Sequence, residues 1–120
     1  MSPSLASLTD EGRPHVLVLY LPSQTREGRE IPHLETIVEN TERTLCAWFA
    51  GVTSYPAMGC YRKKSGETQR EPIRVLECYC EAGDWEKNAA AVMELADALR
   101  QELAQESLAW ALDGRLKVVE

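Results

Sequence analysis

The sequence predicts an α+β protein in which two helices cover one face of an antiparallel sheet. The first observation is the segment 16–21, Val-Leu-Val-Leu-Tyr-Leu, which is apolar at every position. Because a strand turns alternate side chains to opposite faces, both faces of this strand must be covered. The second observation is the order of the periodic segments: strand, helix, two strands, helix and two short strands. We therefore expect helices on one face of the sheet and a second copy of the protein on the other.

The first strand and the helix after it are delimited by proline and glycine. The strand covers residues 15–21 and ends at Pro22, which cannot donate to a ladder and leads into the polar loop 23–30. The helix is expected from about Pro32 to just before Gly51, since proline suits the first turn and glycine the position past the end. One stripe of this helix is largely apolar and consists of Leu34, Ile37, Val38, Thr41, Leu45, Trp48 and Phe49.

The next two strands are predicted over residues 52–61 and 73–80. The segment 62–72 between them contains Lys-Ser-Gly and is expected to be their hairpin connection. Pro56 in the first of these strands favours an edge of the sheet, because an edge strand can lack one backbone donor without losing a ladder bond.

A second helix and two short strands complete the pattern. Asp84 offers a carboxylate cap to the helix, whose apolar residues recur in steps of four and three. We expect this helix to end near Gln105. The strand up to Leu112 alternates bulky and small side chains, and its bulky side, which includes Trp110, could pack on a partner or cap a pocket. The pair Asp113-Gly114 then predicts a tight turn with positive φ before the last strand.

The order βαββαβ followed by an extra strand is typical of ferredoxin-like folds, in which the first and third strands lie inside the sheet. Three short segments carry a resemblance to known proteins: Tyr20-Leu21-Pro22 before a glycine-containing loop, Gly51-Val52-Thr53 after the first helix, and Asp113-Gly114 near the end. Over about residues 14–119 the chain resembles small, uncharacterised ferredoxin-like bacterial proteins that pair their open sheet faces as dimeric α+β barrels. The resemblance implies a homodimer through the open sheet face, and it carries over no catalytic residue.

Length and composition indicate a single domain, and the element order makes it a ferredoxin-like domain over residues 1–120, with residues 1–13 as a flexible N-terminal segment. This segment lacks the basic start and the apolar core of a signal peptide, so we expect a cytoplasmic protein with no membrane span. A net charge of −6 argues against general binding to nucleic acid or to anionic membranes. The cysteines are then expected to be thiols; they are Cys46, Cys60, Cys78 and Cys80.

A basic rim is expected where the first strand ends and the hairpin turns, because in this fold both lie at one edge of the sheet. The six cations expected on it are Arg26, Arg29, Arg62, Lys63, Lys64 and Arg70. Such a rim could bind a phosphate, a nucleotide or an acidic partner through charge-assisted hydrogen bonds. The alternative is an ordinary solvated surface, since the sequence places acidic residues among these cations: Glu27, Glu30, Glu67 and Glu71.

Glu77 is the candidate for acid–base chemistry. It differs in strand parity from Arg74, so one of the two charges faces the helices or the dimer interface, or lies at the strand end. If Glu77 is buried beside Tyr79 or Tyr20, its pKa rises and it can accept a proton; the favoured alternative is an ion pair with an arginine across the dimer. His33, in the first turn of the first helix, is a further candidate, although no neighbour in sequence specifies a triad.

Neither a metal nor a cofactor is expected. Cys78 and Cys80 point to one face of their strand and could approach Cys46, which would suit a thiolate cluster for zinc. Cys-x-Cys without a second knuckle is not the spacing of a structural zinc site, however, and free cysteine is often buried as a small hydrophobe. The sequence also contains no Gly-rich phosphate loop and no nucleophile elbow.

Three functions remain open from the sequence. The leading hypothesis is a non-enzymatic homodimer that binds a small anionic ligand or an acidic partner through the basic rim, with Arg26, Arg29, His33, Arg62, Lys63, Lys64 and Glu77 as candidate ligand-binding residues. The first alternative is a small dimeric α+β barrel enzyme of the isomerase or monooxygenase type that uses Glu77, His33 or a tyrosine. The second is a structural or inhibitory module whose apolar sheet face binds a different protein.

Overall fold

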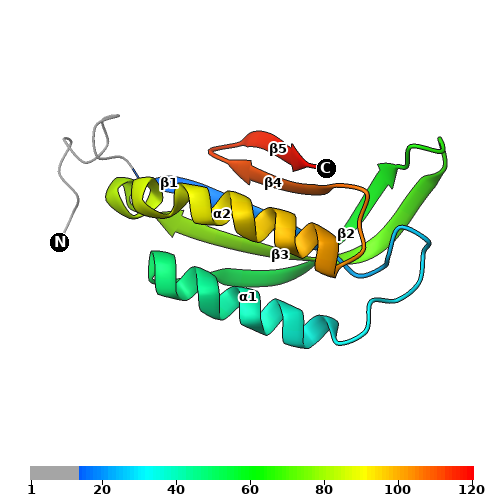
Figure 1. Cartoon of the computed structure of the whole chain (residues 1–120), viewed down its shortest axis with the longest axis horizontal. Helices are drawn as coiled ribbons and strands as arrows, with labels where there is room; N and C mark the ends of the chain where they lie inside the picture. The colour runs from blue at the N-terminus through cyan, green and yellow to red at the C-terminus, as the bar shows by residue number, and fades with distance from the viewer. Residues whose placement is uncertain (1–13) are drawn as a thin grey trace.

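The sheet has five antiparallel strands in the order β2-β3-β1-β4-β5, and two helices lie on one of its faces. The computed structural model describes residues 14–120 of the chain. Figure 1 shows the elements, which are β1 (His15–Pro22), α1 (Leu34–Phe49), β2 (Thr53–Arg62), β3 (Thr68–Cys80), α2 (Ala82–Glu102), β4 (Leu108–Leu112) and β5 (Arg115–Val119). This architecture confirms the predicted α+β class and fits the ferredoxin-like type. The predicted N-terminal segment 1–13 lies outside the described residues.

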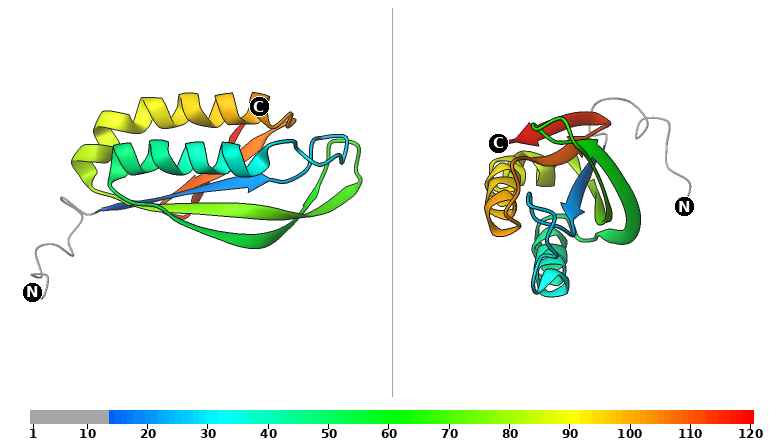
Figure 2. Two further views of the ribbon diagram at one scale, coloured as in Figure 1. Left: turned by 90° about the horizontal axis from the view of Figure 1, so that it is seen from below. Right: turned by 90° about the vertical axis from the view of Figure 1, so that its right-hand side faces the viewer.

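The core lies between the helices and one face of β1. Leu17, Leu19 and Leu21 are fully buried under the helices, because every second side chain of the strand points to that face. The alternate residues Val18 and Tyr20 are half-buried on the open face. Figure 2 shows that both helices cover the same side of the sheet and that no helix of residues 14–120 lies on the opposite side. The helices therefore cover one apolar face of β1, and the other face is only half-buried in residues 14–120.

The β2–β3 hairpin is longer than the sequence predicts and extends past the end of β1. β3 begins at Thr68, five positions before the expected start, and the turn is short: the Lys63 N–H donates to the Glu67 carbonyl at 2.8 Å, and Gly66 has a φ of 93°. β1 pairs with β3 only as far as Pro22 opposite Ile73. Residues 68–72 of β3 therefore pair with β2 alone.

The boundaries of both helices differ from the prediction. α1 starts at Leu34, two positions after Pro32, and Ala50 rather than Gly51 takes the left-handed conformation at its end, with a φ of 70°. α2 starts at Ala82 without a side-chain cap, so the prediction that Asp84 caps it is wrong. Asp84 lies instead in the first turn, where a carboxylate is favoured by the positive end of the helix dipole.

The end of α2 and the position of Trp110 in β4 also differ from the prediction. α2 ends at Glu102, before Gln105, because Ala104 turns into the left-handed region with a φ of 52°. Trp110 is buried in the core, with its ring centroid 6.5 Å from that of Trp85. Trp110 therefore packs in the core under α2. Across residues 14–120, no helix has the length and apolar character that a membrane span needs.

Candidate functional site

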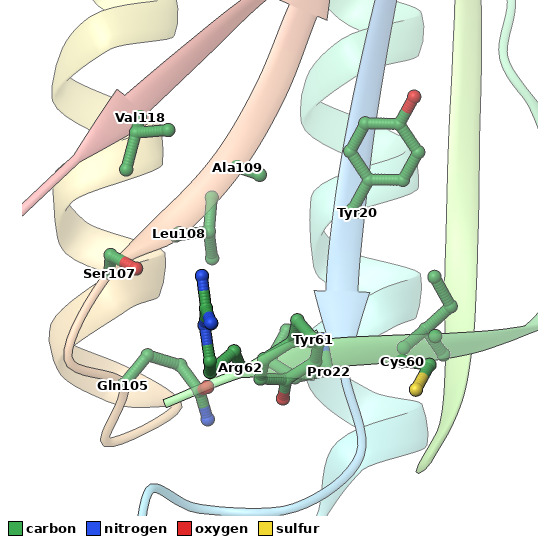
Figure 3. Close-up of a pocket in the computed structure, with 12 residues that line it drawn as sticks. Tyr20, Pro22, Cys60, Tyr61, Arg62, Gln105, Ser107, Leu108, Ala109 and Val118 are labelled. Carbon is green, nitrogen blue, oxygen red and sulfur yellow. The ribbon is translucent and has the colours of Figure 1, made fainter. Parts of the chain in front are cut away.

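A cavity of about 400 Å³ lies at the end of the sheet where β1 stops, between the projecting β2–β3 hairpin and β4. Figure 3 shows it on the side of the strands away from the helices. Its volume is within the range of small-molecule sites. The residues that line it are Tyr20, Pro22, Gly59, Cys60, Tyr61, Arg62, Ile73, Gln105, Ser107, Leu108, Ala109 and Val118.

The lining is mostly apolar, with a few polar groups at one side. Tyr20 and Tyr61 present aromatic rings, and Figure 3 shows the Arg62 side chain extending from the end of β2 toward Leu108. An apolar wall with a small number of placed polar groups is the usual composition of a ligand site. The cavity can therefore hold the apolar body of a small molecule and orient it through polar groups at one end.

Glu71 is the buried charged residue beside this cavity. Its side chain is fully buried, and its Oε2 accepts the backbone N–H groups of Gln24 at 2.7 Å and Ser23 at 3.2 Å. Its Oε1 accepts the hydroxyl of Tyr61. Within residues 14–120 no lysine, arginine or histidine forms an ion pair with this carboxylate. Burial raises the pKa of Glu71, and the N–H groups of Gln24 and Ser23 oppose part of that rise.

The local sequence explains why a carboxylate is buried at this point. Pro22 ends β1, so the N–H groups of Ser23 and Gln24 have no strand partner and need acceptors. Glu71 lies two residues before Ile73 in β3, so its side chain is on the same face of the strand. This part of β3 does not pair with β1. Opposite Glu71, Gly59 of β2 has no side chain, and a Cβ there would meet Ile73 Cγ2 at 3.1 Å. Because Gly59 has no side chain, it leaves space beside Ile73 in the cavity wall.

Gln105 fixes the loop that supplies these N–H groups. It is buried, and its Nε2 donates to the carbonyl of Gln24 at 2.7 Å and to that of Leu103 at 2.8 Å. The Arg26 N–H donates to the Ala104 carbonyl at 3.0 Å, which adds a second tie between the loop and the end of α2. The cavity wall is therefore built from three segments that are distant in sequence and held by hydrogen bonds.

The Tyr61–Glu71 pair can move a proton between the cavity and the interior. Tyr61 lines the cavity and Glu71 does not, so the tyrosine side chain connects the cavity wall to the buried carboxylate through its hydroxyl. A carboxylate that accepts a hydroxyl proton increases the basicity of that hydroxyl, and a carboxyl with a raised pKa is suited to accept the proton. The aromatic faces of Tyr20 and Tyr61 favour a positively charged group in the same cavity.

The structure brings three residues of the predicted basic rim together. Arg26, Arg62 and Lys63 line a smaller hollow of about 60 Å³ that adjoins the cavity. Its other lining residues are Tyr61, Gln69, Gln105, Glu106 and Ser107. Arg29 and Lys64 are exposed and line neither hollow, and Arg70 is likewise directed to solvent.

Glu77 and His33 lie away from the cavity. Glu77 is half-buried on the open sheet face and accepts the Tyr55 hydroxyl at 3.2 Å; with Tyr79 it lines a more open hollow next to the start of β2. His33 is exposed at the N-terminus of α1, with a φ of 58°. Arg74 points to the opposite face of β3, the helix side, where its guanidinium forms an ion pair with Glu35 at 2.6 Å.

Two of the four thiols are buried and two are exposed. Burial raises the pKa of Cys78 to about 12 and that of Cys80 to about 11, so both stay protonated. Cys46 and Cys60 are exposed. No group of three metal-ligating side chains occurs in the part of the chain that the structure describes.

Sequence reasoning missed Glu71, Tyr61 and Gln105 as site residues. Glu71 was assigned to a polar hairpin connection, where its charge has an ordinary solvated explanation. The missed signal is its parity: Glu71 continues the alternation of Ile73 and Val75, which places its side chain on one face with theirs once β3 is extended.

Comparison with known proteins shows the fold. No family model matches the chain, and no curated protein matches it. Among solved structures, a phage SAM lyase in complex with S-methyl-5'-thioadenosine is similar, with a TM-score of 0.68 and 17% sequence identity over 90% of this chain and 88% of that one. The similar structure is an enzyme with a ligand bound. This finding contradicts our leading expectation of a non-enzymatic binding module.

Proposed function

We propose that the chain is a lyase that cleaves a carbon–sulfur bond of a sulfonium nucleoside of the SAM type, with its active site in the cavity beside Glu71. The observation that carries this proposal is a fully buried carboxylate, without a cationic partner in residues 14–120, that is hydrogen-bonded to Tyr61, a residue of the cavity wall. The fold that the chain shares with the phage SAM lyase supports the choice of substrate.

The cavity suits such a substrate in size and in chemistry. About 400 Å³ accommodates a nucleoside with a short side chain. A sulfonium ion is a cation of low hydration, and Tyr20 and Tyr61 offer aromatic faces to it. The apolar wall formed by Ile73, Leu108 and Val118 suits the base and sugar.

The proposed reaction needs a base and no further reactant. The bond between sulfur and the amino-acid chain breaks, and its electron pair stays on sulfur, which leaves as a neutral thioether. The carbon adjacent to the one that carried sulfur loses a proton, and the electrons of that C–H bond form a carbon–carbon double bond between these two carbons. The Tyr61 hydroxyl takes this proton while passing its own to Glu71, whose raised pKa suits it to hold the proton.

The test is turnover of SAM by the purified chain, followed by chromatography of S-methyl-5'-thioadenosine. We expect release of the thioether by the wild type, and a loss of roughly 100-fold or more for Glu71→Gln and for Tyr61→Phe, the usual contribution of a general base.

The second tyrosine–glutamate pair on the sheet supplies matched controls. Tyr55 and Glu77 share the same kind of hydrogen bond, but they lie outside the cavity. Glu77→Gln and Tyr55→Phe should therefore keep wild-type turnover. Absence of turnover by the wild type, or equal losses for both pairs, would contradict the proposal.

We also propose that the ferredoxin-like sheet pairs its open face with a second copy of the chain and that the protein works in the cytoplasm. Several large aromatic or apolar side chains on the open face of β2, β3 and β5 support the pairing, because they are exposed: Tyr55, Tyr79, Leu116 and Val118. The four unpaired cysteines support a reducing compartment.

A further inference from the structure

The small hollow next to the cavity is distinguished by its charges. It shares Tyr61, Arg62, Gln105 and Ser107 with the large cavity, so the two form one continuous site with an apolar and a polar end. Its volume of about 60 Å³ equals that of roughly two water molecules, which is the size of one small polar group. The polar end is thus too small for a base or a sugar.

Two of the cations around this hollow have no ion-pair partner in residues 14–120. Arg62 and Lys63 take part in none of the salt bridges of that part of the chain. Arg26 pairs with Glu27, its Nε lying 3.2 Å from Oε1, and both side chains are about half exposed. Glu106 is the one carboxylate in the lining. In a chain of net charge −6, three cations and one carboxylate around a small hollow form a locally positive site.

We propose that this hollow is a subsite for an α-amino acid group, with Arg62, Lys63 and Arg26 around the α-carboxylate and Glu106 beside the α-ammonium. The proposal rests on the proposed function and adds what distinguishes the substrate from its thioether product. An arginine fork and a lysine ammonium form charge-assisted hydrogen bonds to a carboxylate. The main cavity then holds the nucleoside, and the scissile bond lies between the two hollows, next to Tyr61, which lines both.

The experiment compares the binding of two thioether probes to the full chain by calorimetry. S-adenosylhomocysteine carries the amino-acid end, and S-methyl-5'-thioadenosine lacks it; neither has the sulfonium group that the reaction would consume. We expect the wild type to bind S-adenosylhomocysteine more tightly. Arg62→Gln and Lys63→Ala should each weaken it by about tenfold or more, the effect of losing a charged hydrogen bond, while binding of S-methyl-5'-thioadenosine stays within about twofold.

Lys64→Ala is the matched control, because it removes the same charge from the neighbouring position on the hairpin turn and lines neither hollow. It should leave both affinities unchanged. The subsite alone is overturned if S-methyl-5'-thioadenosine binds but S-adenosylhomocysteine binds no more tightly, or if Lys64→Ala weakens binding as much as Lys63→Ala. If neither probe binds the wild type, the proposed function fails and the subsite with it.

Discussion

Two tyrosine–glutamate pairs on this sheet show how the environment of a residue decides its chemistry. Tyr55 and Glu77 form a hydrogen bond of 3.2 Å at a position exposed to water. Glu71 is fully buried, accepts two backbone N–H groups and the Tyr61 hydroxyl, and has a raised pKa. The same two residue types therefore form a surface contact in one place and a candidate proton-transfer pair in the other.

The raised pKa of Glu71 predicts a pH dependence of stability. The folded chain holds this proton to a higher pH than the unfolded chain, whose carboxyl titrates near 4.5. The contribution of the group is complete below that pH and is lost as the pH rises through the folded pKa. We expect the free energy of unfolding of the wild type, relative to Glu71→Gln, to increase as the pH falls from about 7 to about 4. Urea denaturation of both proteins measures it; a relative decrease would contradict burial as the dominant cause.

Asp113 predicts the opposite dependence. The hydrogen bond with His15 Nδ1, 2.7 Å from Oδ2, lowers the pKa of Asp113, as does the bond that its Oδ1 accepts from the Val16 N–H. Its contribution is present above the ordinary value of 3.8 and is lost as the pH falls through the lowered one. Since the pair is exposed, Asp113→Asn should destabilise by less than about 1 kcal/mol near pH 7. That difference should disappear in strong acid when both proteins are unfolded by urea, and a difference that persists there would point to the turn instead.

Among the individual residues of the site, some could be predicted from the sequence. Arg62 and Lys63 follow from their place at the turn of a hairpin, which a charge pattern shows directly. Glu71 could not be found in the same way, because its burial depends on loop N–H groups from Ser23 and Gln24, which are more than forty positions away in the chain. Hydrogen bonds between distant segments leave no local periodicity in a sequence.

At the scale of the elements, β1 is the strand on which the fold depends, and its two faces differ in burial. Leu19 is fully buried under the helices, whereas Val18 is half-buried on the open face. The sequence pattern shows that both faces are apolar, and the structure adds that residues 14–120 fully cover only one of them. The extended β3 was underestimated for a related reason: its first five residues are mostly polar, and they pair with β2 alone.

Truncation of β1 side chains tests this difference. Leu19→Ala should lower the free energy of unfolding by roughly 2–5 kcal/mol, because it leaves a cavity in a packed core. Val18→Ala should cost less than half as much in the monomer, because that face already contacts water. Chemical denaturation at low protein concentration measures both values, and equal losses would mean that the open face is covered as completely as the core.

At the scale of the whole molecule, the order of elements predicted the architecture, since a helix, a hairpin and a second helix restrict the connections that a sheet allows. The assembly stays a prediction. Light scattering over a dilution series should give the mass of a dimer, and Tyr79→Lys, which places a charge on an exposed apolar side chain of the open face, should shift the mass toward the monomer. A monomer at all concentrations would exclude pairing through this face.

The central claim is that the cavity between the β2–β3 hairpin and β4 is the ligand site. A titration of the isotope-labelled chain with S-methyl-5'-thioadenosine, followed by amide chemical shifts in NMR, tests it most directly. The account predicts that the largest shifts fall on the cavity residues of β1, β2 and β4, such as Tyr20, Tyr61 and Ala109. Shifts centred on the more open hollow at Val52 and Glu77, or no shifts at all, would contradict it.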